Sequence, residues 1–218
     1  MIDDLFPHGL HGIIYDCDGV MIDSRSANTL FYNRVLAHFG LPPMTPEQEM
    51  YSFMATGMQA LEHILPVSLH PQIKEVVRTA VNYDRDIVPL LTLMPGFKDF
   101  VLEIHGLGLR QAICTNRTSQ GFGAVLQFFK FPKIFEPIVT VSSSPPKPNS
   151  QGAKSVTKQW GCEPGQILFV GDSAHDRDAA RGAGQLFAAF NGLGIQGDIT
   201  CANYGELRSI LAPHLGLS

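Results

Sequence analysis

The sequence predicts an α/β fold: a parallel sheet covered by helices on both faces, with a helical insert after the first strand. Short, nearly continuous apolar runs recur along the 218 residues, as is typical of strands buried on both faces. Helical patterns separate most of these runs, which favours parallel strands joined by crossover helices. Residues 24–92 break this alternation, because they show helix signals and no convincing strand.

Five apolar runs, each bounded by polar or turn residues, are the predicted strands. They are residues 12–15, 111–114, 137–141, 166–170 and 186–190. Apolar residues recur at helical spacing from about 96 to 105, and again after Ser119. Strands and helices in alternation predict a Rossmann-like core of three layers.

The insert carries its own helix signals. Four apolar residues spaced four apart mark its first helix: Ala27, Phe31, Val35 and Phe39. Gly40 then supplies a stop. Residues 45–48 combine a cap threonine, a first-turn proline and a capping-box glutamine, which predicts a second helix start. A third helix is predicted from about 72 to 88, just before Pro89.

Composition and charge exclude several classes of protein. The net charge of −4 argues against a nucleic-acid binder, which needs a basic face. No apolar run approaches the roughly 18 residues of a membrane span, and the acidic N-terminus does not resemble a signal peptide. The four cysteines are scattered without a C-x-x-C pair, so we expect reduced thiols in a cytoplasmic protein with no nucleic-acid or membrane partner.

Polar residues that follow the strands carry the candidate chemistry. In open parallel sheets, ligands bind at the carboxyl ends of the strands. Four successive strands lead to these residues: Asp16, Asp18 and Gly19; Thr115 and Asn116; Lys147; then Asp172 and Ser173, with Asp176 close behind. The topology therefore predicts that acids, a hydroxyl and an ammonium group meet at one edge.

That collection of groups suits phosphoryl transfer. Carboxylates held together repel one another, and a bound cation relieves the repulsion. Oxygen ligands in a compact cluster favour Mg²⁺. Asp16 can attack phosphorus to form an aspartyl phosphate, while Asp18 can protonate the leaving alcohol and later activate water. Thr115 can donate a hydrogen bond to a phosphoryl oxygen, and Lys147 can balance the charge.

Each piece taken alone also has a purely structural explanation. Asp-x-Asp pairs are common in loops, and Thr115-Asn116 makes a good turn or cap. Lys147 could be a solvated loop lysine, and residues 171–173 could simply cap the next helix. Their joint occurrence, in order and each at a strand end, favours a functional site.

The same residues resemble the four motifs of the haloacid dehalogenase superfamily, in the family's order and over essentially the whole chain. The matching segments are residues 16–20, 115–116, 147–148 and 171–176. The nearest subgroup in this resemblance contains phosphoglycolate phosphatases and β-phosphoglucomutases. The resemblance implies an Mg²⁺-dependent phosphatase acting on a small phosphorylated metabolite. It also implies a helical cap domain at residues 24–92, inserted into a core domain of residues 1–23 and 93–218.

The resemblance implies a role for each motif residue. Asp16 corresponds to the nucleophile and a metal ligand, and Asp18 to the acid/base whose backbone carbonyl also binds the metal. Asp172 corresponds to the remaining protein ligand of Mg²⁺. The phosphate-binding set comprises Thr115, Asn116 and Lys147, and the supporting residues are Asp176, Gly19 and Ser173. In the cap, the segment that resembles the substrate-selecting loop is Thr56, Gly57, Met58 and Gln59.

Several alternatives must be compared with hydrolysis. Dehalogenases and phosphonatases of this superfamily lack an acid at the place of Asp18. The β-phosphoglucomutase pattern has a histidine where this chain has Asn28 and a basic residue where it has Ala60, so we favour a hydrolase over a phosphomutase. A response-regulator receiver is too short and carries its acids differently. A catalytically inactive relative that only binds its ligand remains open.

Overall fold

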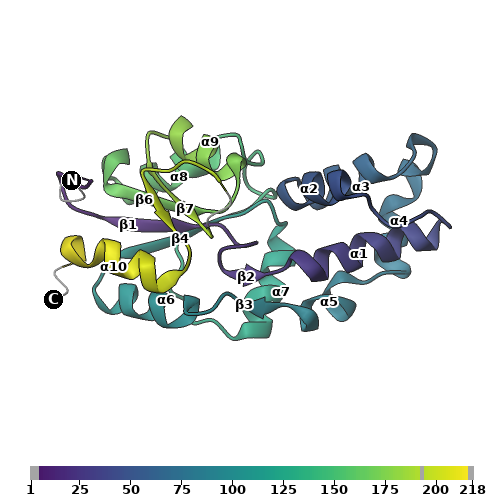
Figure 1. Ribbon diagram of the computed structural model, residues 1–218, viewed down its shortest axis with the longest axis horizontal. Helices are drawn as coiled ribbons and strands as arrows, with labels where there is room; N and C mark the ends of the chain where they lie inside the picture. The colour runs from purple at the N-terminus through teal and green to yellow at the C-terminus, as the bar shows by residue number, and fades with distance from the viewer. Residues whose placement is uncertain (1–4, 192–193, 216–218) are drawn as a thin grey trace.

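The computed structural model describes residues 5–191 and 194–215 and shows an α/β lobe joined to a helical lobe (Figure 1). The α/β lobe is built on a sheet of six parallel strands. In spatial order these are β5 (Ile138–Val139), β4 (Arg110–Cys114), β1 (Gly12–Tyr15), β6 (Ile167–Gly171), β7 (Leu186–Phe190) and β8 (Ile199–Cys201). The predicted fold class is confirmed.

Helices cover both faces of the sheet, and alternate side chains of β1 belong to different cores. Ile13 and Tyr15 face the core formed with α6 (Phe97–Gly106), α7 (Ser119–Phe129) and α10 (Tyr204–Leu215). Ile14 faces the core formed with α8 (Gln151–Trp160) and α9 (Ala174–Gly182). Burying each large apolar side chain contributes about 1.5–3 kcal/mol, so this alternation fixes the register of the central strand and the direction of its carboxyl end.

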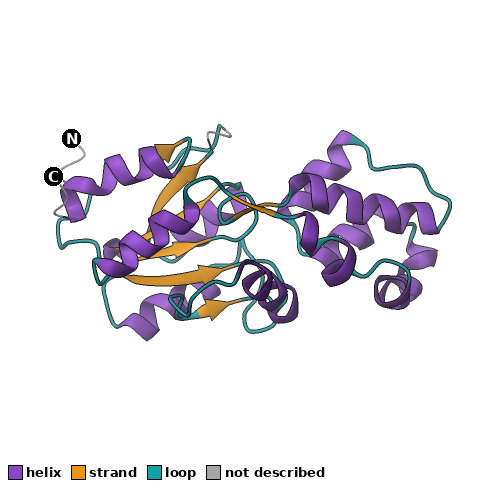
Figure 2. Ribbon diagram, turned by 90° about the horizontal axis from the view of Figure 1, so that it is seen from below, coloured by secondary structure: helices purple, strands orange, loops and turns teal. Residues whose placement is uncertain are grey.

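The helical lobe lies between β1 and β4 in the sequence. Its elements are α1 (Arg25–His38), α2 (Pro46–Met54), α3 (Gly57–Ile64), η2 (Val67–Gln72), α4 (Ile73–Thr79), α5 (Tyr83–Asp86) and η3 (Val88–Leu90). The antiparallel ribbon of β2 (Ile22–Asp23) and β3 (Thr92–Leu93) connects the two lobes (Figure 2). The capping box predicted at Thr45 and Gln48 is confirmed. Among the described helices, none has the length and apolar character needed to cross a membrane.

Two details of the sequence prediction are wrong or incomplete. The single helix predicted from about 72 to 88 is wrong: α4 ends at Thr79 and α5 begins at Tyr83. The Asn82 side chain accepts a hydrogen bond from the backbone N–H of Arg85 at 2.9 Å, so it caps a new helix instead of continuing the old one. The strand β8 was not predicted, because its three residues are too few to show a period.

Candidate active site

Asp16 follows β1 directly and is held in place by its neighbours. Its backbone N–H donates to the carbonyl of Val170 at 3.0 Å, which extends the ladder between β1 and β6. Its carboxylate Oδ1 accepts a hydrogen bond from the backbone N–H of Cys17 at 2.6 Å and lies 2.6 Å from the Nζ of Lys147. The other oxygen, Oδ2, has no hydrogen-bond or ion-pair partner among the described residues. One carboxylate oxygen therefore anchors the side chain and the second remains available for chemistry.

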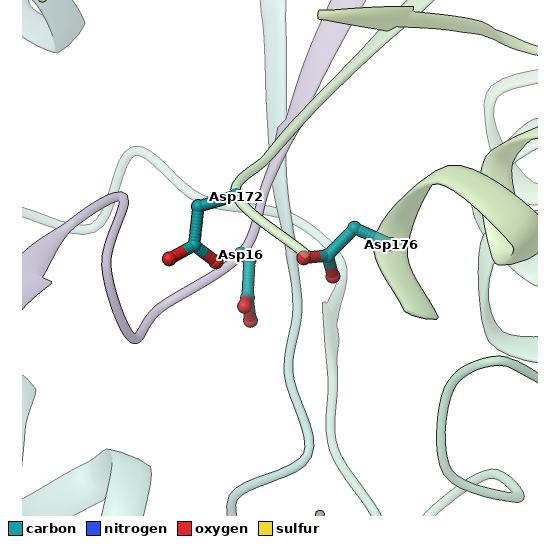
Figure 3. Close-up of side chains that lie close together, drawn as sticks. All are labelled: Asp16, Asp172 and Asp176. Carbon is teal, nitrogen blue, oxygen red and sulfur yellow. The ribbon is translucent and has the colours of Figure 1, made fainter. Parts of the chain in front are cut away.

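Three buried carboxylates converge at the carboxyl edge of the sheet. Asp172 follows β6, Asp176 lies in the first turn of α9, and each offers an oxygen within 4.8 Å of the others and of Asp16. Figure 3 shows the three carboxyl groups gathered around one small region. Asp176 is fixed by Ser173, whose backbone N–H and hydroxyl donate to Oδ2 at 3.0 and 2.5 Å. Lys147 lies 2.6 Å from the Oδ1 of Asp176 and so bridges two of the acids.

The loop of Lys147 is positioned by the residues that follow β4. The Asn116 side chain accepts from the backbone N–H of Lys147 at 2.8 Å and donates to its carbonyl at 3.1 Å. The Thr115 hydroxyl oxygen accepts from the backbone N–H of Arg117 at 3.1 Å, which leaves its own O–H to be donated. The Asn116 side chain therefore orients the lysine loop, while the Thr115 hydroxyl can face an incoming oxygen.

The acids carry more negative charge than one lysine can balance. Burial, with the neighbouring Asp176 and Asp18, raises the pKa of Asp16 to about 7 despite Lys147. Burial, followed by repulsion from Asp176 and Asp16, raises the pKa of Asp172 to about 9. A divalent cation relieves such repulsion, and an all-oxygen donor set suits Mg²⁺. The residues present therefore fit an Mg²⁺ ion.

A pH dependence of stability follows from these two carboxyl groups. Their folded pKa values, about 7 for Asp16 and about 9 for Asp172, exceed the ordinary value of 3.8. Between the ordinary value of 3.8 and these raised values, the folded state therefore binds more protons than the unfolded chain. The free energy of unfolding falls as pH rises toward about 7 for Asp16 and toward about 9 for Asp172. In the presence of EDTA, we expect the melting temperature to fall by at least about 2–4 °C between roughly pH 6 and pH 9.

Two controls make that measurement specific. Adding Mg²⁺ should restore the melting temperature at the alkaline end, because the cation favours the ionised carboxylates. Asp172→Asn should lose the upper part of the decline, because it removes the group that titrates last. A melting temperature that stays constant or increases with pH in EDTA would contradict this account.

Gly19 allows Asp172 to reach the cluster. Its backbone has φ of +77°, a region that L side chains rarely adopt. A β-carbon at this position would also overlap the carboxyl group of Asp172. The turn after β1 and the carboxylate after β6 can approach this closely only because residue 19 has no side chain.

We expect Gly19→Ala to reduce activity far more than its cost in stability would explain. The matched control is Gly40→Ala, because Gly40 has φ of +68° and a β-carbon there would meet no atom within 4 Å. Both variants should lose about 1 kcal/mol or more from backbone strain, measured by urea unfolding. The Gly19 variant alone should lose activity, by at least about tenfold, because it displaces a carboxylate. Equal activity losses in the two variants would show that backbone strain alone is responsible.

Asp18 is held by an arginine that the sequence analysis missed. The Nε of Arg117 donates to Oδ2 and its Nη2 donates to Oδ1, both at 2.7 Å. The Ser24 hydroxyl also donates to Oδ1. Burial alone raises the pKa of Asp18, but Arg117 and the hydrogen bonds from Ser24 and Asn28 hold it below its usual value. The only sequence signal was the position of Arg117, immediately after Thr115-Asn116.

The same arginine connects the core to the helical lobe. Its Nη2 donates to the hydroxyl of Tyr83 at 2.8 Å, and that hydroxyl donates to the Oδ1 of Asn28 at 2.6 Å. A second connection lies at the end of α2, where the Met54 carbonyl accepts from Asn116 at 3.3 Å and contacts the Nδ1 of His175 at 3.1 Å. The helical lobe therefore contacts Arg117, which holds the candidate acid Asp18, and Asn116, which orients the loop of Lys147.

A cavity of about 760 Å³ lies between the two lobes, and Asp16 and Asp18 form part of its wall. All four cap residues named from the sequence, Thr56, Gly57, Met58 and Gln59, line it. They form the capped start of α3 and not a loop: the Thr56 hydroxyl accepts from the backbone N–H of Gln59 at 3.2 Å. The candidate nucleophile and the cap residues thus share one cavity.

This arrangement agrees with the comparisons of the chain with known proteins. The family described as haloacid dehalogenase-like hydrolase matches residues 13–190. The chain belongs to this family. A phosphoglycolate phosphatase of Cereibacter sphaeroides is 27% identical over 186 residues, covering 82% of this chain and 84% of that protein. Because the chain belongs to this hydrolase family and is similar to a phosphoglycolate phosphatase, this haloacid dehalogenase-like protein is a phosphoric monoester hydrolase.

Solved structures of the family have the same architecture. A subfamily IA hydrolase from Geobacter sulfurreducens is 31% identical, with a TM-score of 0.74, and the match covers 94% of this chain and 98% of that one. CbbY from Rhodobacter sphaeroides, determined as a mutant in complex with xylulose-1,5-bisphosphate, is 18% identical with a TM-score of 0.72, covering 91% and 96%. At that identity CbbY shows the shared fold alone. The ligand in that CbbY structure is a phosphorylated sugar.

Proposed function

We propose that this haloacid dehalogenase-like protein is an Mg²⁺-dependent phosphatase that hydrolyses a small phosphate monoester through an aspartyl phosphate on Asp16. The observation that carries the proposal is the setting of Asp16. One oxygen is anchored by Cys17 and Lys147, the other has no partner among the described residues, and the residue lines the interlobe cavity. An in-line nucleophile needs such fixed placement, because positioning supplies much of the rate.

Each neighbouring residue has a role in this proposal. The Asp16 carboxylate attacks phosphorus, and the Lys147 ammonium and Thr115 hydroxyl offset charge on the phosphoryl oxygens. Asp18 is ionised in the resting site, so it takes up a proton when the negative charge of the bound phosphate raises its pKa. It transfers this proton to the leaving alcohol and then takes one from the water that cleaves the aspartyl phosphate. Arg117 orients the Asp18 carboxyl group, because it contacts both of its oxygens.

The carboxylates of Asp16 and Asp172, with the backbone carbonyl of Asp18, would hold Mg²⁺. The ion would supply positive charge to the phosphoryl oxygens. Asp176 and Ser173 act behind these residues: Asp176 holds Lys147 in place, and Ser173 holds Asp176. Gly19 leaves room for Asp172.

The domain division proposed from the sequence is a cap of residues 24–92 and a core of residues 1–23 and 93–218. The β2–β3 ribbon lies at both junctions, which supports it. A phosphomutase is the second candidate, but two observations favour hydrolysis. Ala60 is fully buried and offers no cation, and the Asn28 side chain is already bonded to Tyr83 and Ser24. Neither position supplies a cation that would pair with a second phosphate.

Removal of the metal tests the cofactor. We expect EDTA to reduce phosphatase activity on an aryl phosphate by at least about 10²-fold, because the repelling carboxylates then lack their counter-charge. Addition of Mg²⁺ should restore activity, and addition of EDTA saturated with Mg²⁺ is the matched control for a direct effect of the chelator. Full activity in protein shown by elemental analysis to be free of metal would contradict the proposal.

A further inference from the structure

The cavity beside Asp16 and Asp18 is much larger than a two-carbon alcohol requires. Its volume is about 760 Å³, within the range of roughly 300–1,000 Å³ that holds drug-sized ligands. In the proposed function the phosphoryl group lies only at the end beside Asp16. The remaining space belongs to the part of the substrate that leaves as the alcohol.

The wall of this space is largely apolar, and four helices of the cap supply most of its apolar side chains. The apolar lining residues include Phe31 and Tyr32 on α1, Phe53 on α2, Leu61 on α3, and Ile73 and Val77 on α4. Phe31 is itself fixed by edge-on contacts with Tyr32 and Tyr83, with ring centroids 5.2 Å apart in both pairs. Phe31 and Tyr32 are only 5% and 6% exposed, so the edges of these rings are the parts that reach the cavity. Such edges can contact the face of a ring in the substrate, a contact that adds to the burial of apolar area.

The charges along the wall do not favour a second anion on the substrate. Arg117 is buried, and its charge is already paired with Asp18, to which it donates two hydrogen bonds. Arg78 pairs with Glu75 at 2.8 Å, and both side chains are more than half exposed. Lys74 is the remaining lining cation among the described residues, and it is also exposed. A carboxylate or second phosphate buried here would have no buried cation left to pair with it, which is costly.

From this shape and charge we infer that the substrate is a phosphate monoester of an uncharged aromatic alcohol, whose ring occupies the apolar cap cavity. The inference rests on the proposed function, because it assumes that the phosphoryl group lies at Asp16. It selects among monoesters by the alcohol part, for which the cap supplies rings and aliphatic side chains.

A matched set of substrates tests this inference. 2-Phenylethyl phosphate and ethyl phosphate both release primary alcohols, so their phosphoryl groups are similarly reactive. Phosphoglycolate adds a carboxylate to the same two-carbon unit. We expect kcat/KM for 2-phenylethyl phosphate to exceed that for each of the other two by at least about tenfold, because an apolar pocket discriminates by roughly that factor for each group it buries.

Variants of the cavity wall locate the effect. Val77→Thr keeps the shape of the side chain and adds a hydroxyl to the wall, and Met58→Gln makes a second lining position polar. The matched controls are Val67→Thr and Met50→Gln, since Val67 and Met50 are 79% and 66% exposed cap residues outside the cavity wall. The two lining variants together should reduce the preference for the phenylethyl ester by at least about threefold. The two control variants should leave it unchanged.

Binding of stable phosphonates separates this inference from the proposed function. By calorimetry, 2-phenylethylphosphonate should bind at least about tenfold more tightly than ethylphosphonate. If no ester is hydrolysed but this difference in binding is present, the proposed function fails and the aromatic site remains. If the esters are hydrolysed but phosphoglycolate or ethyl phosphate equals the phenylethyl ester in kcat/KM, the inference is overturned and the phosphatase remains.

Discussion

Asp16→Asn is expected to abolish turnover and formation of the covalent intermediate. The amide cannot attack phosphorus, and it also removes one carboxylate from the set that fits Mg²⁺. We expect kcat to fall by at least about 10³-fold on any phosphate monoester, as for loss of a nucleophile in other enzymes. Rapid quenching with a radiolabelled phosphate ester should trap a phosphorylated protein in the wild type and none in the variant.

The fold should remain intact in this variant, so the loss can be assigned to chemistry. Asn is close to Asp in size, and it removes a charge that is strained by burial at this position. The melting temperature in EDTA should therefore be unchanged or increased. Asp178→Asn is a matched control, since Asp178 lies on α9 close to Asp176 in the sequence but pairs with Arg177 at the surface. A radiolabelled intermediate in Asp16→Asn would show that another residue is the nucleophile.

Asp18→Asn should separate the two chemical steps. The variant keeps the backbone carbonyl proposed to bind the metal, but it loses the proton donor and the base for the second step. An aryl phosphate has a good leaving group that needs little protonation. We therefore expect a burst of phenol release of about one equivalent per active site, followed by a steady rate at least about 10²-fold below that of the wild type.

The contact between Arg117 and Tyr83 provides a control for the Asp18 variant. Its guanidinium contacts both oxygens of Asp18 and the hydroxyl of Tyr83. Tyr83→Phe removes the contact to the cap while leaving the Asp18–Arg117 pair, so it is the matched control for loss of lobe-to-lobe contact. The burst should appear in Asp18→Asn and be absent in Tyr83→Phe. A burst in Asp16→Asn and none in Asp18→Asn would reverse the two assignments.

Local patterns were sufficient to predict five of the six strands of the sheet and the helices α6 and α7. A strand buried on both faces must be continuously apolar, and such runs predicted β1, β4, β5, β6 and β7. Elements without such a pattern were missed or misjudged. β8 is three residues long, and the break between α4 and α5 depends on a single capping side chain, Asn82. Two-residue strands such as β2 and β3 show no period at all.

The sequence by itself determined which chemical groups follow each strand. Asp16, Thr115, Lys147 and Asp172 could be assigned to one edge, because parallel strands in one sheet end on the same side. The succession of strands and helices along the chain was enough for this deduction. In the structure, Asp16, Asp172 and Asp176 each offer a carboxylate oxygen within 4.8 Å of the others. Family resemblance then supplied a role for each position.

Only the tertiary structure decided what surrounds the acid/base and what the cavity can hold. Arg117 and Asp18 are separated by 99 residues in the sequence, and Tyr83 and Asn28 by 55. No local periodicity predicts such pairs, because they depend on how the cap rests on the core. The apolar wall of the cavity likewise arises from helices whose apolar faces serve both the cap interior and the substrate space. A sequence pattern shows that such a face is apolar, but only the packing of the lobes determines which of its side chains remain open to a ligand.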